Sequence, residues 1–582
     1  MVWFLVSFCV IRRADPIVLY QYFSDVYGLY PWYNSKIDNQ GGISKPVKNI
    51  FARFTIVTLA VVLAAGVFIQ HISADNGVPF EDISTSYAKK EIIDLYNRNI
   101  LTGTSNTKFS PTQSITRAEF ITVLDRLLKL DPALSPVSPY TDVAKSAWYY
   151  GWIQAAVQLE LANGTSATTF APAKAVTRQE AAVWIAKALK QTNTATAAQT
   201  IFKDRQQIAS WASAAVAKVN DRGLMKGDNS GNFRPADPIT RQETAVLMDR
   251  VLQHSSWAAE LESNPDKRIV IGWQYGLTTA QFENHVLQSN VNTLSPRWYY
   301  VGKTGAVTDS TDASLVTWAK KNKKQVWAMV GNRSDQEATH QMLLSTTARN
   351  TAVNQLAALV SKYGLDGLNI DFENVAAEDR VYLTSFITLL AEKMRSLDVI
   401  LSMDVSPDLG TDWTEAFDYA ALGKQVNYMV MMGYDEHYDG SQVPGSNASL
   451  SYDQKAVNTI LKVVPSQKVI LALPLYNRDW TLNQKGTVLS SQYITLPEQN
   501  QIISSYASRP VWNPSLGQYV ANYSKQAIKH TIWIEDGRSL ITKYNLAVTK
   551  KLAGVAYWYI GGESSDVWSS LRNAEKFYDY TF

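Results

Sequence analysis

The octapeptide that decides the fold of the C-terminal half is Asp366-Gly367-Leu368-Asn369-Ile370-Asp371-Phe372-Glu373. Successive residues of a β-strand face opposite sides, so one face of this segment should be apolar and the other should carry Asn369, Asp371 and Glu373. Carboxylates that alternate with apolar residues at the end of a buried strand are expected at a functional site. Two carboxylates placed close together resist ionising at once, which raises the pKa of one of them and keeps a proton available.

Short apolar runs recur on both sides of the octapeptide and alternate with helical patterns. The eight runs expected to be strands are 268–273, 291–294, 325–330, 367–372, 399–405, 426–432, 468–473 and 553–559. Eight strand-plus-helix units in residues 268–582 predict a (β/α)8 TIM barrel, whose chemistry lies at the C-terminal ends of the strands. The long interval 476–552 contains further strand-like segments. It predicts an α+β insertion between the seventh and eighth strands, forming one wall of a cleft.

The N-terminal half contains a threefold repeat with a period of about 60 residues. We assign the repeats to residues 75–135, 136–198 and 199–252, followed by a linker at 253–267. Each repeat has a helical apolar pattern, a glycine, a Phe-x-Pro turn and a Thr-Arg-x-Glu box. The boxes are Thr116-Arg117-Ala118-Glu119, Thr177-Arg178-Gln179-Glu180 and Thr240-Arg241-Gln242-Glu243. The pattern predicts a mainly α-helical module in a multidomain protein.

The Thr and Glu of each box form a capping box at the start of a helix. Capping does not explain the Arg, because a cation beside the positive end of a helix is mildly unfavourable. The triplet resembles S-layer homology (SLH) modules, which hold proteins to wall polysaccharides that carry pyruvyl groups. The resemblance implies that Arg117, Arg178 and Arg241 contact an acidic sugar of a secondary cell-wall polysaccharide.

The octapeptide resembles the DGxDxDxE signature of family 18 glycoside hydrolases, and residues 268–582 agree with that family. In these enzymes the substrate supplies its own nucleophile, the 2-acetamido group. The resemblance implies that Glu373 is the general acid, and that Asp371 orients the acetamido group and stabilises the oxazolinium intermediate. The anomeric configuration should be retained, and a substrate without an N-acetyl group should not react.

Three further elements match the sugar-binding parts of the family. Residues 432–435 resemble M-x-Y-D, residues 474–480 resemble P-x-Y-G-R-x-W, and the eighth run holds a matching Trp. The resemblance implies a catalytic role for Tyr434, whose hydroxyl is expected to bond the acetamido carbonyl. It implies substrate contacts for Asn369, Met432, Asp435, Tyr476, Trp480 and Trp558. Trp558 is expected to be the floor on which the reacting sugar stacks, whereas core packing is an equal alternative for Trp480.

Two departures from the usual chitinase pattern narrow the prediction of the substrate. Asn369 stands where chitinases usually have Asp, and Phe372 stands where they usually have Trp. Both resemble the branch of spore germination and cortex-lytic proteins, which are N-acetylglucosaminidases acting on peptidoglycan. We therefore expect a glycosidase acting on N-acetylated wall glycan. A chitinase of the same mechanism and a non-catalytic glycan-binding protein remain the alternatives, the latter disfavoured by the presence of both Asp371 and Glu373.

Composition limits the other functional classes. The 582 residues are 46% hydrophobic and 18% charged with a net charge of +3, which is typical of globular domains and gives no basic field for nucleic acid. Cys9 is the single cysteine, so neither an intramolecular disulfide nor a Cys-based zinc cluster can form. The histidines are scattered without ligand spacing. We expect no metal and no cofactor.

Residues 44–74 have the pattern of an export signal. Lys45, Lys48 and Arg53 precede an uncharged stretch, and Ala74 offers a cleavage point. An uncleaved membrane anchor is the alternative, although the stretch is shorter than the ~20 residues that span a bilayer. We expect residues 1–43 to be an overextended translation start. The mature protein is expected to be exported and held at the cell wall of a Gram-positive-type bacterium, with no other membrane contact.

Overall fold

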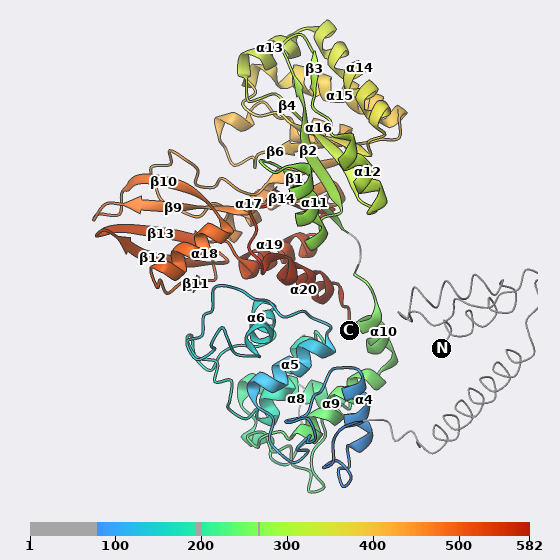
Figure 1. The fold of residues 1–582 in the computed structure, drawn as a ribbon, viewed down its shortest axis with the longest axis vertical. Coiled ribbons are helices and arrows are strands. Elements are labelled where there is room, and N and C mark those ends of the chain that lie inside the picture. Colours follow the sequence, from blue (N-terminus) through green and yellow to red (C-terminus); the bar gives the residue numbers. More distant parts are fainter. Residues whose placement is uncertain (1–77, 192–200, 266–267) are drawn as a thin grey trace, which may run out of the picture. The chain divides into compact units, whose positions relative to one another are not determined.

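The computed structural model describes residues 78–191, 201–265 and 268–582 (Figure 1). The predicted translation start and export signal lie outside these described residues. Within the described ranges, no helix combines the length and the apolar character needed to cross a membrane. A helical region up to Glu262 is followed along the chain by an α/β region that begins at Ile269.

Each of the three repeats contributes two helices. The pairs are α4 (Lys89–Asn97) with α5 (Arg117–Leu127), α6 (Tyr150–Gln158) with α7 (Arg178–Ala188), and α8 (Ser210–Asp221) with α9 (Arg241–Gln253). The aspartate near the start of each repeat accepts two backbone N–H groups of the Phe-x-Pro turn, which fixes the loop between the helices. These aspartates are Asp82, Asp142 and Asp204.

The stretch predicted to be a linker is partly folded. Residues Ser255–Glu262 form helix α10. Trp257 and Leu261 on this helix are buried, so its apolar face packs against the rest of the protein. The linker between the repeats and the barrel is therefore shorter than the sequence pattern indicated.

The second helix of every repeat begins with the predicted capping box. The Arg beside each cap reaches the Glu of a different repeat. The ion pairs are Arg117–Glu180 at 2.8 Å, Arg178–Glu243 at 2.9 Å and Arg241–Glu119 at 2.9 Å. They join the first repeat to the second, the second to the third and the third to the first. Each Arg also donates to two backbone carbonyls of the repeat it reaches. This closed arginine ring gives the recurring Arg a structural reason that needs no ligand.

The C-terminal region contains the predicted closed barrel of eight parallel strands. They are β1 (Ile269–Gln274), β2 (Thr293–Val301), β4 (Gln325–Gly331), β5 (Gly367–Asp371), β6 (Ile400–Val405), β7 (Tyr428–Met432), β8 (Val469–Pro474) and β14 (Gly554–Ile560). Strand β1 pairs with both β2 and β14, which closes the sheet. Strand β3 (Val307–Asp309) adds a short antiparallel extension to β2.

Helices follow the strands in the order that the alternating pattern predicts. They are α11 (Thr279–Gln288), α12 (Ala313–Lys321), α13 (Gln336–Leu344), α14 (Thr346–Tyr363), α15 (Arg380–Ser396), α16 (Tyr419–Gln425), α17 (Leu450–Ile460), α19 (Gly537–Thr549) and α20 (Val567–Asp579). The parallel strands bring their C-terminal ends to one rim of the barrel.

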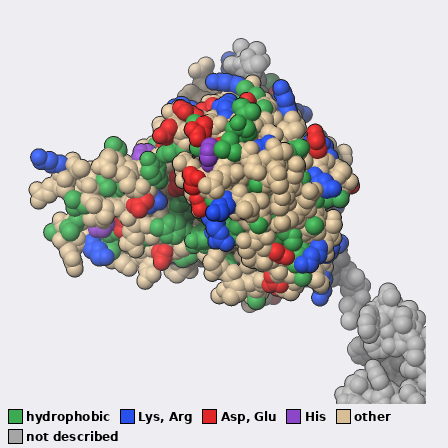
Figure 2. Space-filling model, turned by 90° about the horizontal axis from the view of Figure 1, so that it is seen from above, with side chains coloured by type: hydrophobic (Ala, Val, Ile, Leu, Met, Phe, Trp, Pro, Cys, Tyr) green, Lys and Arg blue, Asp and Glu red, His purple; other side chains and the backbone are tan. Residues whose placement is uncertain are grey.

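The predicted insertion between β8 and β14 is a separate antiparallel sheet, seen as its own lobe in Figures 1 and 2. Its order is β10 (Val488–Thr495), β9 (Tyr476–Leu482), β13 (Ile528–Ile534), β12 (Gln518–Lys525) and β11 (Val511–Asn513), with helix α18 (Leu496–Ser505). The face seen in Figure 2 mixes acidic and basic side chains, as the small net charge indicates.

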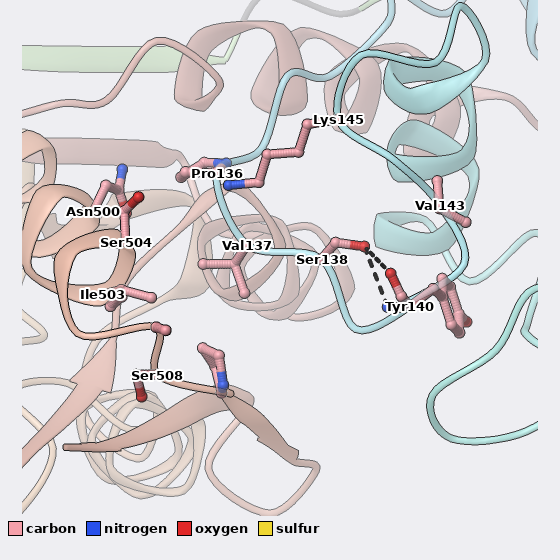
Figure 3. Close-up of a pocket in the computed structure, with 12 residues that line it drawn as sticks. Pro136, Val137, Ser138, Tyr140, Val143, Lys145, Asn500, Ile503, Ser504 and Ser508 are labelled. Carbon is pink, nitrogen blue, oxygen red and sulfur yellow. Dashed lines mark hydrogen bonds between the residues drawn. The ribbon is translucent and has the colours of Figure 1, made fainter.

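A pocket lies between the loop that precedes α6 and helix α18 (Figure 3). Val137, Tyr140 and Lys145 line it from the helical region, and Ile503 and Ser508 line it from the insertion. None of the residues predicted to bind a glycan lines this pocket. It is therefore not the site that the octapeptide predicts.

Replacing Glu180 with Gln tests the arginine ring. Gln can still cap α7, but Arg117, which is only 2% exposed, loses the carboxylate that it faces. Breaking a buried ion pair by removing one partner costs about 3 kcal/mol or more, so the free energy of unfolding of the helical region should fall by about that amount in urea titrations.

The matched control is Glu262→Gln, which removes the carboxylate of an exposed pair with Lys129. Exposed pairs contribute about 0–1 kcal/mol, so this variant should unfold almost as the native protein does. Equal losses in the two variants would contradict a structural role for the ring.

Candidate active site

Strand β5 places the octapeptide as its alternation predicts. Phe372 stacks on Phe386 of α15 with ring centroids 5.8 Å apart, so this face turns to the helices. Asn369 lies on the opposite face, inside the barrel, and is completely buried. Asp366, which precedes the strand, accepts the N–H of Val326 on β4 at 2.8 Å and so supports the pairing of the two strands.

The amide of Asn369 is fully hydrogen-bonded. Its oxygen accepts from Trp273 Nε1 at 2.9 Å and from Ser295 Oγ at 3.1 Å. Its nitrogen donates to Ser402 Oγ at 3.0 Å and to Asp404 Oδ1 at 2.7 Å. A carboxylate at this position could not donate to either of these oxygens. Asn369 therefore supports the site from beneath and has no free group for a substrate in this structure.

Asp404, at the end of β6, is a buried carboxylate that was not predicted as a site residue. Burial, followed by repulsion from Asp371, raises its pKa well above the ordinary range. Burial, followed by the carboxylate of Glu373, raises the pKa of Asp371 to about 8, and Arg297 opposes this shift. Asp371 and Asp404 therefore retain protons in the barrel near neutral pH. A signal was available, because Asp404 is the only charged residue in the predicted strand 399–405.

Glu373 is exposed at the mouth of the barrel and is held by the loop after β4. Asn332 Nδ2 donates to the Glu373 carbonyl at 2.7 Å, and its Oδ1 accepts the Glu373 N–H at 3.1 Å. Ser334 Oγ donates to Glu373 Oε2 at 2.8 Å. Neither Asn332 nor Ser334 was predicted, since contacts between two loops leave no periodic signal in the sequence.

Tyr434, Asp435 and Tyr476 come together beside the carboxylates. The hydroxyl of Tyr476 donates to Asp435 Oδ1 at 2.6 Å. Burial raises the pKa of Asp435, while this hydrogen bond and Arg478 act against the shift. Burial also raises the pKa of Tyr434 well above its ordinary range, so its hydroxyl stays protonated and able to donate. Met432, the last residue of β7, packs against the buried cluster that contains Tyr434 and Tyr476.

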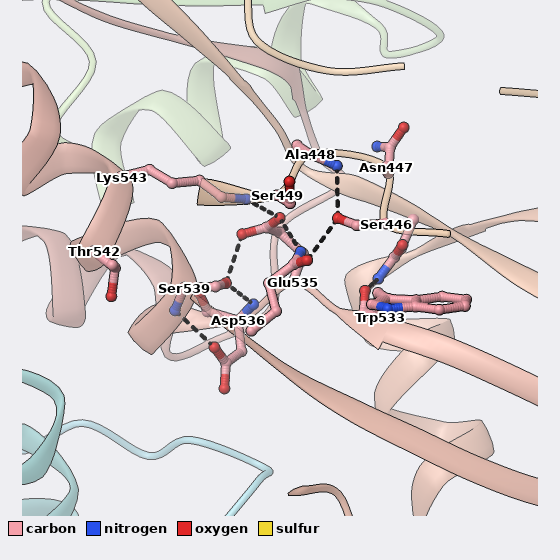
Figure 4. A network of polar contacts seen from close by, with 12 residues as sticks. Ser446, Asn447, Ala448, Ser449, Trp533, Glu535, Asp536, Ser539, Thr542 and Lys543 are labelled. Atoms are coloured by element: carbon pink, nitrogen blue, oxygen red, sulfur yellow. Dashed lines mark hydrogen bonds and ion pairs between the residues drawn. The ribbon is translucent and has the colours of Figure 1, made fainter. Parts of the chain in front are cut away.

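A buried polar network holds the loop that follows Asp435 (Figure 4). Asn447 Oδ1 accepts the N–H of Asp435 at 3.3 Å, and the neighbouring Ser446 begins the network. The network connects Ser446, Gln518, Glu535, Ser539 and Lys543. Glu535 and Lys543 are both almost inaccessible to solvent and lie 2.5 Å apart. The insertion and α19 therefore fix the position of Asp435.

The two predicted tryptophans differ in exposure. Trp558, on β14, is partly buried and contacts Tyr275 with ring centroids 5.6 Å apart. Stacking of a sugar on its remaining surface stays a prediction. Trp480 is completely buried, and its Nε1 donates to the Gly445 carbonyl at 2.9 Å. Trp480 therefore packs in this structure and presents no face to a substrate, which fits the packing alternative.

The arginines predicted to contact a wall polysaccharide are nearly buried in the arginine ring. Two of them reach surface pockets: Arg178 beside Tyr87, and Arg241 beside Trp148. Both aromatic residues are exposed. Contact with an acidic sugar stays a prediction.

No group of three or more His, Cys, Asp or Glu side chains that could hold a metal ion occurs in the described part of the chain. His437, beside Asp435 in sequence, donates from Nδ1 to the Ser446 carbonyl at 2.9 Å. This contact holds His437 against the loop that follows Asp435.

Known protein families match both halves of the chain. The model of glycosyl hydrolases family 18 matches residues 274–563. The model of the S-layer homology domain matches residues 79–121, 139–182 and 201–245. The first matched range lies within the barrel region, and each of the other three lies within one helical repeat.

Individual known proteins are also similar to parts of this chain. The uncharacterized glycosylase YvbX of Bacillus subtilis (strain 168) is 27% identical over 319 residues, covering 53% of this chain and 92% of that protein. The cortical fragment-lytic enzyme of Bacillus cereus is 26% identical over 247 residues, covering 40% of this chain and 55% of that protein. The crystal structure of the Bacillus cereus spore cortex-lytic enzyme SleL shares the fold, with a TM-score of 0.50 at 21% identity over 53% of this chain and 75% of that chain. The protein is a family 18 glycosidase whose catalytic domain follows three S-layer homology domains, which associate it with the cell surface.

Proposed function

We propose that the protein is an exported N-acetylglucosaminidase that cleaves peptidoglycan-type wall glycan with retention of configuration. The observation that carries this proposal is the arrangement of carboxylates at the barrel mouth. Asp371 and Asp404 hold protons inside the barrel, and Glu373 stands exposed above them where a glycan can reach it. The SLH repeats, in this proposal, hold the enzyme to a secondary cell-wall polysaccharide.

In this proposal each step of the reaction is assigned to a residue. Glu373 gives its proton to the glycosidic oxygen as the bond from C1 to that oxygen breaks. The carbonyl oxygen of the substrate's 2-acetamido group bonds to C1 and forms an oxazolinium, which Asp371 orients and stabilises. Tyr434 donates a hydrogen bond to the acetamido carbonyl, with Asp435 beside it. Glu373 then takes a proton from water, whose oxygen attacks C1 and regenerates the acetamido group.

Three observations favour wall glycan over chitin as the substrate. Asn369 and Phe372 replace the residues usual in chitinases, a similar relative is named for lysis of cortical fragments, and the SLH domains support a location at the cell wall. A chitinase of the same mechanism is the second candidate. Mass spectrometry of products from purified peptidoglycan and from chitin oligomers separates the two.

Replacing Glu373 with Gln tests the assignment of the acid. An amide cannot protonate the leaving oxygen, and general acid catalysis contributes about 10²–10⁴-fold, so hydrolysis of N-acetylated glycan should fall by about that factor while binding persists. The matched control, Glu378→Gln, alters an exposed glutamate of the same loop and should leave turnover unchanged. A native protein that binds N-acetylated glycans and turns none of them over would establish the non-catalytic alternative.

Two opposite substitutions test whether the buried carboxyls Asp371 and Asp404 set the pH dependence of the reaction. Asn369→Asp adds a carboxylate against Asp404 and should raise the pKa of the pair further, moving the alkaline limb of the pH–rate profile upward by about 0.5–1 pH unit. Asp404→Asn removes a carboxyl whose ionised form repels ionised Asp371, and it should move the same limb downward. If both variants are active and the alkaline limb moves in neither of them, the proton used in catalysis does not depend on Asp371 and Asp404.

A further inference from the structure

Arg297 is a cation at the barrel mouth that the proposed reaction does not use. Ser295, two residues earlier on β2, bonds to Asn369 inside the barrel. Alternate residues of a strand share a face, so Arg297 lies on the same lumenal face and nearer the C-terminal rim. Its charge acts on Asp371, whose pKa it lowers. Arg297 therefore lies close to the reacting centre.

The guanidinium of Arg297 lies against the aromatic floor. Its central carbon is 5.1 Å from the ring centroid of Tyr275 and 5.9 Å from that of Trp558, the predicted sugar-stacking residue. Its Nε is buried and has no hydrogen-bond partner. In the described part of the chain, no carboxylate lies within ion-pair distance of this guanidinium.

An unpaired cation at this position is unfavourable for the proposed reaction. The oxazolinium that forms beside Asp371 is itself positively charged, and two like charges close together repel each other. The buried Nε donor adds the cost of an unmade hydrogen bond. Both penalties are relieved when an anionic group of the substrate pairs with the guanidinium, whose planar fork suits a carboxylate.

We propose that Arg297 binds a carboxylate carried by the glycan, namely the lactyl ether carboxylate of a muramic acid residue adjoining the cleaved bond. This inference rests on the proposed function and specifies its substrate class. Chitin carries no such group. Arg297 is thus the residue that selects peptide-free peptidoglycan strands, in which the lactyl carboxylate is free, over uncharged N-acetylated glycan.

The test compares three N-acetylated substrates: peptide-free peptidoglycan strands, the same strands with their lactyl carboxylates methyl-esterified, and chitin tetramer. Charged hydrogen bonds correspond to about 10- to 100-fold in kcat/KM, so esterification should cost the native enzyme that factor. Arg297→Gln should lose the native preference for acid strands over esterified strands and over chitin tetramer, apart from any change that all three substrates share through the pKa of Asp371. Arg297→Lys should recover only part of the loss, because Lys lacks the bidentate fork.

Arg395→Gln, at the exposed end of α15, is the matched control and should change none of these rates. Equal losses by Arg297→Gln on all three substrates, or no loss on any, would overturn the assignment. Binding of the acid and esterified strands to Glu373→Gln protein, with and without Arg297→Gln, measures the same discrimination without turnover. The native enzyme's failure to cleave any substrate would then count against the proposed function alone.

Discussion

The barrel site depends on the burial of one uncharged amide among ionisable groups. Asn369 satisfies its two acceptors and its two donors at once, and it ties β1, β2 and β6 to β5 at a single point. Because the amide carries no charge, Asp404 and Asp371 can lie next to it at a cost that their protonation relieves. Glu373 can then stand at the rim, held by the loop after β4.

The sequence predicted the fold in detail where a local pattern determines it. All eight barrel strands, the insertion and the capping boxes follow from alternation, from apolar runs and from the Thr-x-x-Glu spacing, and all are confirmed. Helix α10 was missed because it has only eight residues and lies between two longer patterns, and only the tertiary packing of Trp257 and Leu261 reveals it.

The site was predicted less completely than the fold, for a physical reason. The octapeptide carries Asp371 and Glu373 on one strand, so their proximity follows from strand geometry alone. Asp404, Asn332 and Ser334 approach them from other strands and loops, and such contacts have no fixed separation in sequence. The recurring Arg of the repeats was easy to recognise in the sequence. Its partner, the Glu of another repeat, became clear only in the structure.

The closed arginine ring also constrains the order in which the helical region can form. Glu119 and its partner Arg241 are 122 residues apart in the chain, which corresponds to roughly 6–24 s of synthesis at ~5–20 residues per second. Until the third repeat has been made, the first repeat has a carboxylate without its cation. The helical region therefore completes itself as a triplet at the end of its synthesis, and a chain interrupted after two repeats would leave one unpaired group at each end.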